Sequence, residues 1–313
     1  DNNNDFISYS VGGSFVFSEL LKPGFLNYAK LRGSYGKTGN DAPAFGTLTY
    51  YNAANAGPGG FVSGNQFPIF STVAFERAEQ LGNAEIRPES TKEYELGAEF
   101  RFWDSRFRLD LTYYNKETTD QIISVDQPAV TGFTSRVINA GVISNEGWEV
   151  LAFINPIRTD NFNWNIDINW TTYENTTLKL AENVESVTLQ DISASSRVIV
   201  GESYGVIFGS RFARNENGEL LIDDSGYPLV DTEEGVIGDP IPDWNAGIRN
   251  TLSYKNFSLS ALLDVRQGGD VWCGTCAVID YFGTSQVTAE QRTITDYVFE
   301  VIQNSNFGQE IHE

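Results

Sequence analysis

The feature that most constrains this chain is a series of segments, each about ten residues long, in which apolar and polar residues alternate. The clearest pair runs from Tyr94 to Tyr114, with a short turn at Asp104 and Ser105. A period of two places the apolar side chains on one face of a β-strand and the charged side chains on the other. In a soluble sandwich the apolar face would lie against a second sheet, whereas in a membrane barrel it would face lipid.

Eight such segments can be drawn, and they form four hairpins with short turns. Each is close to the ~9–11 residues of a tilted transmembrane strand. The expected strands are about 6–17, 26–36, 93–102, 107–116, 146–154, 162–171, 244–254 and 257–266. Long segments follow the hairpins, at about 37–90, 118–138, 172–243 and 268–313.

Short turns at one end and long loops at the other are typical of outer-membrane barrels, in which the long loops are extracellular. We therefore expect an all-β fold: an antiparallel transmembrane β-barrel portion with long extracellular loops, forming a single domain over 1–313. Aromatic residues near strand ends, such as Trp103 and Tyr254, suit the girdles of such barrels. The expected lipid-facing residues are Leu96, Phe100, Phe102, Leu109, Leu111, Trp148, Val150, Ile166, Ile168, Leu259, Ala261 and Leu263.

The composition argues against several classes of function. The chain has 42 acidic and 21 basic residues, which disfavours a nucleic-acid partner because phosphates require a basic surface. No segment approaches the roughly 20 consecutive apolar residues of a membrane helix, which excludes helical membrane proteins only. The single histidine, His312, lies near the end of the sequence, and carboxylate pairs carry no information in so acidic a chain. We expect no enzymatic activity and no cofactor.

Two local motifs raise the question of metal binding or redox chemistry. Cys273 and Cys276 form a C-x-x-C pair without the further ligands that zinc needs and without a thioredoxin-like setting. In an oxidising compartment a local disulfide is the favoured interpretation, with free thiols as the alternative. The oxygen-rich segments Asn215–Gly218 and Asp223–Gly226 suit hairpin turns, and calcium binding is a weaker alternative. We expect no metal site.

Six short motifs follow one another along the chain. Lys30–Asn40 (KLRGSYGKTGN) resembles a signature of SusC/RagA-type TonB-linked outer-membrane transporters, and Ile86–Gly97 (IRPESTKEYELG) resembles a motif of TonB-dependent receptors more widely. Four further motifs resemble SusC-type motifs: Asn139–Gly141 with Asn145, Gly147 and Glu149; Gly201–Gly205 (GESYG); Gly238–Trp244 (GDPIPDW); and Arg266–Asp270 (RQGGD). The resemblance covers nearly all of the chain.

The resemblance implies a 22-stranded barrel that encloses an N-terminal plug and works beneath a SusD-like lipoprotein lid. This chain would supply about 8 of those strands, as a C-terminal portion with the plug domain absent. The implied partners are the lid, the TonB complex through the missing plug region, outer-membrane lipid and a glycan or peptide substrate. The implied location is the cell outer membrane of a Gram-negative bacterium of the Bacteroidetes type.

Polar residues that face the lumen are the candidates for contact with a transported nutrient. Asp264 and Arg266 lie toward the external end of the last expected strand, and Trp272 and Tyr281 follow it. Aromatic rings beside carboxylates suit sugars, and the same mixture suits peptides. We therefore expect these four residues to contribute to substrate binding.

Two other functions remain open from the sequence. Eight strands are enough to close a small barrel, so the chain could be a self-contained outer-membrane adhesin or structural protein. It could also be a soluble carbohydrate-binding β module. The soluble module predicts that the apolar faces led by Leu109 and Leu259 are buried against a second sheet.

Overall fold

The computed structural model describes residues 6–21, 24–56, 65–182, 184–192, 194–295 and 302–303, so His312 lies outside the described residues. The chain divides into two compact units, where the sequence led us to expect one domain. The first unit comprises Asp1–Thr188, Val198–Tyr204 and Pro242–Gly268. The second comprises Leu189–Arg197, Gly205–Ile241 and Gly269–Glu313. The second unit lies entirely within the long segments 172–243 and 268–313, and the remaining parts of those segments belong to the first unit.

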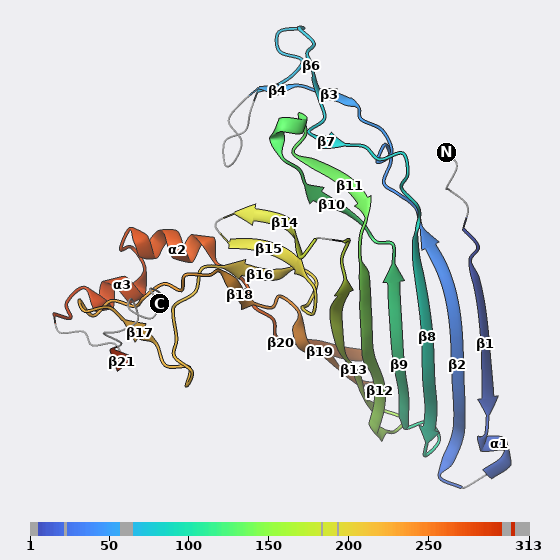
Figure 1. The fold of residues 1–313 in the computed structure, drawn as a ribbon. Coiled ribbons are helices and arrows are strands. Elements are labelled where there is room, and N and C mark those ends of the chain that lie inside the picture. The colour runs from blue at the N-terminus through green and yellow to red at the C-terminus, as the bar shows by residue number, and fades with distance from the viewer. Residues whose placement is uncertain are drawn as a thin grey trace. The chain divides into compact units, whose positions relative to one another are not determined.

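The first unit is built on one eight-stranded antiparallel sheet (Figure 1). Its strands, in spatial order, are β1 (Tyr9–Val16), β2 (Leu26–Asn40), β8 (Glu89–Phe102), β9 (Phe107–Thr119), β12 (Val142–Arg158), β13 (Phe162–Lys179), β19 (Pro242–Tyr254) and β20 (Phe257–Gly268). Each of the eight expected ranges overlaps one of them. Over the residues that the structure describes, β1 and β20 are the outer strands and do not pair with each other.

The hairpins of this sheet turn at one end, which we call the turn end; the opposite end is the loop end. Trp103, Asp104 and Ser105 all have positive φ angles of 50–61° between β8 and β9. Lys255, between β19 and β20, has a φ of 49°. Left-handed residues let a tight turn follow the right-handed twist of the strands that it joins. The short connections therefore keep successive strands adjacent and antiparallel.

The register of the strands gives the sheet an apolar face and a polar face. The apolar face carries residues that lie directly opposite one another along the row Phe100, Leu109, Ala152, Ile168, Ile248 and Leu263. The polar face carries the neighbouring row Glu99, Asp110, Leu151, Asn169, Gly247 and Asp264. Opposite residues share a face, so the register places all twelve residues expected to face lipid on the apolar face.

No second sheet covers the apolar face in the described residues, contrary to the expectation for a soluble module. Leu259 is 67% exposed, Leu96 is 61% exposed and Leu109 is only partly buried. A contiguous apolar surface of this extent marks a site of contact with lipid or protein.

Aromatic rings gather at both ends of the apolar face. At the loop end, Tyr113 lies 6.4 Å from Tyr94 and 5.1 Å from Trp148, measured between ring centroids. At the turn end, Phe102 lies 5.8 Å from both Trp103 and Phe107. Tyr94 and Phe102 are eight residues apart on β8, which is about 26 Å along a strand. That spacing is comparable to the ~25 Å apolar band of outer-membrane barrels.

Smaller elements form the long segments. Three of the small sheets are the pair β3 (Tyr51–Ala53) and β6 (Phe75–Arg77), the pair β4 (Asn55–Ala56) and β5 (Asn65–Gln66), and the trio β10 (Ile122–Asp126), β11 (Ser135–Asn139) and β7 (Gln80–Leu81). The other two are the quartet β14 (Ser186–Ile192), β15 (Ala194–Ile199), β16 (Val206–Gly209) and β18 (Gly235–Gly238), and the pair β17 (Leu221–Ile222) and β21 (Ile302–Gln303). The helical segments are α1 (Ser18–Leu21), η1 (Ala129–Thr131), α2 (Gly274–Tyr281) and α3 (Gln286–Gln291). Across the described residues, none of the helices has both the length and the apolar character needed to cross a bilayer.

A small hydrophobic core stabilises the loop end of the first unit. Its buried side chains are Ile123, Val125, Ala140, Leu180, Val187 and Val198. Tyr204 packs against this core from the segment Val198–Tyr204. The core therefore fixes the position of the segment Val198–Tyr204, which begins in the last two residues of β15.

The two cysteines form a disulfide at the start of α2. The Sγ atoms of Cys273 and Cys276 are 2.02 Å apart, and the Cys276 N–H donates a hydrogen bond to the Cys273 Sγ. The pair closes a loop of four residues in the second unit.

Candidate functional site

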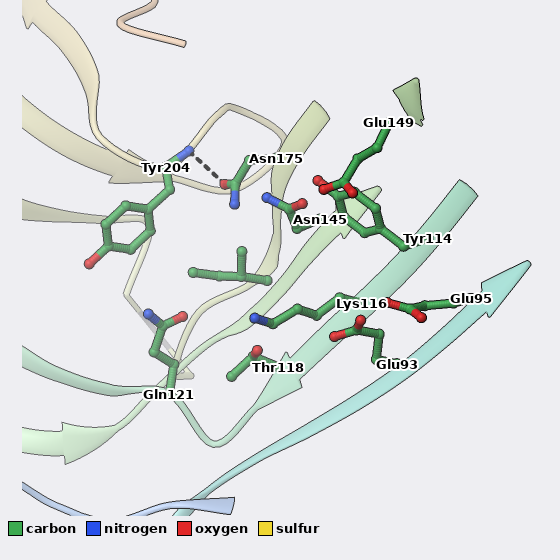
Figure 2. Close-up of a pocket in the computed structure, with 11 residues that line it drawn as sticks. Glu93, Glu95, Tyr114, Lys116, Thr118, Gln121, Asn145, Glu149, Asn175 and Tyr204 are labelled. Atoms are coloured by element: carbon green, nitrogen blue, oxygen red, sulfur yellow. Dashed lines mark hydrogen bonds between the residues drawn. The ribbon is translucent and has the colours of Figure 1, made fainter. Parts of the chain in front are cut away.

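A pocket of about 470 Å³ opens on the polar face near the loop end of the sheet (Figure 2). Its walls come from β8, β9, β12 and β13 and from the segment Val198–Tyr204. The lining residues are Glu93, Glu95, Tyr114, Lys116, Thr118, Gln121, Ile143, Asn145, Glu149, Asn175 and Tyr204. Carboxylate, amide and phenol groups therefore converge on one concave surface, as Figure 2 shows.

Strand register brings these side chains together from distant parts of the sequence. Glu93 lies opposite Lys116, Lys116 lies opposite Asn145, and Asn145 lies opposite Asn175. The four residues form one row across four strands, and alternation places all of them on the polar face. The adjacent row places Glu95 opposite Tyr114.

Three of the sequence motifs meet at this pocket. Glu93 and Glu95 belong to the motif at Ile86–Gly97, and Tyr204 belongs to the motif at Gly201–Gly205. Asn145 and Glu149 belong to the motif that begins at Asn139. In the sequence, two of these motifs lie where an expected strand begins after a long segment, and the third lies within the long segment 172–243. All three therefore belong to the loop side of the expected sheet, and that shared position could have located the pocket.

The Tyr204 segment is held against β13 by its backbone. The Tyr204 N–H donates to the Asn175 Oδ1 over 3.2 Å, and the Thr177 N–H donates to the Glu202 carbonyl over 2.9 Å. The Gly201 N–H donates to the Thr177 carbonyl over 2.8 Å. Burial raises the pKa of the Tyr204 phenol, and the nearby charge of Glu89 raises it further. Tyr204 is therefore held in place beside the pocket, and its phenol is uncharged at neutral pH.

Gly147 leaves the room that Tyr114 occupies. A Cβ atom at Gly147 would lie 2.8 Å from the Tyr114 hydroxyl and 2.5 Å from the Thr172 carbonyl oxygen. Any side chain at this position would collide with backbone as well as with the phenol. These close approaches explain why the motif has a glycine at position 147.

The pocket carries unbalanced negative charge. Glu93, Glu95 and Glu149 face only one cation, Lys116, and none of these four groups makes an ion pair within 4.0 Å in the described part of the chain. Among the described residues, the buried Oε1 of Gln121 finds no hydrogen-bond partner. Such a lining suits a polar ligand with hydroxyl or ammonium groups. The described residues contain no cluster of His, Cys, Asp and Glu that could hold a metal ion.

None of the four residues expected from the sequence to bind substrate lines this pocket. Asp264 and Arg266 lie two residues apart on the polar face of β20. Trp272 precedes α2, and Tyr281, which is 84% exposed, ends that helix. The four residues belong to the last strand of the sheet and to the segment after it, whereas the pocket forms across β8, β9, β12 and β13. A role for these four residues stays a prediction.

Comparison with known proteins adds a family and a fold. Residues 1–298 match the family described as "TonB dependent receptor-like, beta-barrel". The chain is 31% identical to TonB-dependent receptor P26 of Formosa agariphila, over 78% of this chain and 26% of that protein. It is 24% identical to TonB-dependent receptor SusC of Bacteroides thetaiotaomicron, over 82% of this chain and 26% of that protein. The chain thus spans about a quarter of the length of these curated relatives.

A solved structure shares the fold. The structure of the RagAB peptide transporter superposes with a TM-score of 0.66 at 19% identity, covering 84% of this chain and 29% of that chain. The resemblance stated from the six motifs and the all-β fold are thereby confirmed. The family is one of receptors and transporters rather than of enzymes. The chain belongs to the TonB-dependent receptor family and forms part of the barrel of a SusC-like outer-membrane member of the Bacteroidetes type.

Proposed function

We propose that the chain is part of the barrel wall of a TonB-dependent importer that takes up glycans, peptides or similar nutrients. In this proposal the apolar face contacts lipid, the polar face lines the lumen, and the long segments lie outside the cell. The single observation that carries it is the continuous apolar face with aromatic rings at both ends.

The charges on the polar face support this orientation. Arg32 pairs with Asp110 over 2.7 Å, and Lys30 pairs with Glu99 over 2.8 Å. A charged side chain at the bilayer midplane costs about 2–4 kcal/mol on the lipid face of such barrels. Turning the polar face to lipid would place several charges there at once, so the opposite orientation is strongly favoured.

The outer strands β1 and β20 support a larger barrel. Their outward-facing N–H and C=O groups have no partner strand in the described residues, and such groups cannot remain unpaired in hydrocarbon. We propose that further strands of the same polypeptide pair with them, giving the 22 strands that the resemblance implies. An open eight-stranded sheet gives no support to a self-contained adhesin.

The partners follow from the family. Because SusC and the RagAB transporter are among the similar proteins, we propose that a SusD-like lipoprotein covers the external mouth. We also propose that the TonB complex supplies energy through a plug domain enclosed by the barrel. The acidic pocket would offer an entering nutrient a polar surface at the loop end of the barrel wall.

Uptake in the native host tests this function. The measurement is accumulation of labelled oligosaccharides and peptides by cells that carry the full-length protein, its gene disruption, or an intact gene without TonB. We expect at least one nutrient whose uptake falls to background in both mutants. Uptake that depends on the protein and persists without TonB would contradict the proposal.

The pocket is tested in the same cells. A variant with Glu93→Gln and Glu149→Gln should change uptake of that nutrient severalfold. The matched control is Glu182→Gln, which removes a carboxylate outside the pocket lining. Equal uptake by the two variants would show that the carboxylates of the pocket play no part in transport.

A further inference from the structure

A second pocket, of about 490 Å³, lies on the polar face nearer the turn end, and its lining holds three cations and three carboxylates, whereas the first pocket has an acidic excess. One row of opposed residues crosses it. That row is Arg101, Arg108, Phe153, Asp167, Arg249 and Leu262, on β8, β9, β12, β13, β19 and β20. We call it the arginine row.

Two guanidinium groups of the arginine row lack a carboxylate partner. Arg101 pairs with Glu99 over 2.7 Å. Arg108 and Arg249 make no ion pair within 4.0 Å anywhere in the described ranges, although Asp167 lies opposite Arg249 in register. Each of these two guanidinium groups can therefore donate hydrogen bonds to a bound anion.

The local charge balance is positive. The groups that line the pocket, with the partners of their ion pairs, are the cations Lys30, Arg32, Arg101, Arg108 and Arg249 and the carboxylates Glu99, Asp110 and Asp167. Five positive and three negative groups leave a net charge of +2, in a chain whose net charge is −21. Excess positive charge is thus concentrated at this level of the polar face.

Apolar side chains interrupt the polar face at the same place. Leu151 is 59% exposed and Leu262 is 60% exposed, and both line the pocket. They break the alternation of β12 and β20, where every residue of Val150–Ile154 is apolar. Burying one such side chain is worth about 1.5–3 kcal/mol. An occupant with its own apolar group would therefore gain free energy here.

Phe153 holds one of the free guanidinium groups in place. The Cζ of Arg108 lies 3.9 Å from the centroid of the Phe153 ring. Stacking orients the planar guanidinium and reduces the conformational entropy that it loses when an anion binds. The edge of the group keeps its N–H donors available for two parallel hydrogen bonds to a carboxylate.

We propose that this pocket binds a carboxylate carried next to an apolar group. The carboxylate would lie between Arg108 and Arg249, and the apolar group would contact Leu151, Phe153 and Leu262. The inference rests on the lumenal orientation of the polar face, which is part of the proposed function. The same chemistry has two sources, a ligand in transit or a segment of the same polypeptide outside this chain.

Thiol accessibility in the full-length protein distinguishes these sources. Leu262→Cys reports on the pocket, and Ser258→Cys, on the same face of the same strand, is the matched control. The two cysteines of this chain are joined in a disulfide, so the introduced cysteine is the thiol that is measured. Mass spectrometry identifies the peptide that carries the modification. The reagent is N-ethylmaleimide, and the probes are acetyl-Leu-Glu-Leu-amide and its Leu-Gln-Leu counterpart.

A ligand in transit gives one pattern. Leu262→Cys should react as fast as Ser258→Cys without a probe, and the Glu peptide alone should slow it. A segment of the same polypeptide gives the other pattern, with Leu262→Cys at least about tenfold slower than the control before any probe is added. Either pattern should disappear when Arg108→Gln and Arg249→Gln are combined, because a charge-assisted hydrogen bond is worth about tenfold or more in affinity.

Other outcomes overturn the inference. Equal reaction at both positions, unchanged by either peptide and by the arginine substitutions, means that nothing occupies the pocket. Protection that survives the arginine substitutions, or that the Gln peptide gives equally, means that a carboxylate is not recognised. Arg158→Gln, at the turn end outside the pocket, controls for loss of one positive charge, and heat-modifiable gel migration confirms that each variant is folded.

A separate result would show that the polar face does not line the lumen. In that case Leu259→Cys, on the apolar face, would react with the reagent and Ser258→Cys would not. This result would contradict the proposed function as well, whereas an empty pocket with a reactive Ser258→Cys would contradict the inference alone.

Discussion

Arg32 on β2 reaches past a neighbouring strand to Asp110 on β9, and its guanidinium donates two hydrogen bonds to that carboxylate, of 2.9 and 2.7 Å. The side chain passes over Gly97 on β8, the strand between them. The same guanidinium donates to the Thr112 hydroxyl over 2.6 Å. One arginine thus ties three adjacent strands together on the polar face.

The Arg32 side chain can cross β8 because residue 97 is a glycine, so Gly97→Ala should destabilise the barrel. A Cβ atom there would lie 2.5 Å from the Arg32 Nε and 2.6 Å from its Cζ. Displacing the guanidinium should lower the free energy of unfolding by about 1–3 kcal/mol. Denaturant titration of the full-length protein in lipid vesicles measures the change. Gly13→Ala on β1 is the control and should be neutral, because no atom of the residues that the structure describes lies within 4 Å of its added Cβ.

The coupling between Arg32 and Asp110 should be measurable in a double-mutant cycle. Both side chains are about one-third exposed, so solvent screening limits the expected coupling energy of Arg32→Gln and Asp110→Asn to about 1 kcal/mol. The Arg87–Asp120 pair, 3.5 Å apart and more exposed, should couple by less than about 0.3 kcal/mol. Similar coupling energies for the two pairs would contradict the role given to Arg32.

The two faces of β20 should respond differently to charge. Leu263→Arg, on the apolar face, should reduce the free energy of unfolding in vesicles by about 2–4 kcal/mol, because it places a cation against hydrocarbon. Ser260→Arg, on the polar face of the same strand, should change that free energy by less than about 0.5 kcal/mol. A larger loss for Ser260→Arg would mean that the faces have been assigned in the wrong sense.

A loop ion pair predicts a local loss of structure in acid. The Glu233 N–H and the Arg211 guanidinium donate hydrogen bonds to Asp231, and they hold the pKa of its carboxyl below its usual range. A depressed folded-state pKa means that the stabilisation is present above the unfolded value of about 3.9 and is lost as the pH falls through the folded pKa. Hydrogen exchange of the peptide around Asp231 should therefore accelerate below about pH 4. In Asp231→Asn this acceleration should be absent; its persistence would assign the transition to another group.

Alternation predicted the strands and their shared face because both depend on a period that the sequence displays directly. Phe100, Leu109 and Ile168 could be placed on one face without knowing any contact, since each strand shows its own apolar side. The strands β12 and β13, with 17 and 18 residues, run beyond their expected ranges. In β13 the missed part, 172–179, carries polar residues on both faces, so the sequence shows no apolar side there. The alternating pattern fades where the strands run beyond the apolar band.

The pocket could not be predicted in the same way because it depends on register between strands. Lys116, Asn145 and Asn175 show no distinctive pattern in the sequence, and only pairing across four strands brings them into one row with Glu93. Arg32 and Asp110 are likewise 78 residues apart. A single sequence shows which face a residue occupies, but not which residue of the next strand lies opposite it.

The central claim is that the apolar face of this sheet contacts lipid and the polar face contacts water. Spin labels placed one at a time from 258 to 265 on β20 of the full-length protein in bilayers test it most directly, by their collision rates with oxygen and with a water-soluble nickel chelate. The account predicts a strict period of two, with oxygen reaching 259, 261, 263 and 265 and the nickel chelate reaching 258, 260, 262 and 264. A profile without that period, or with the two sets exchanged, would contradict it.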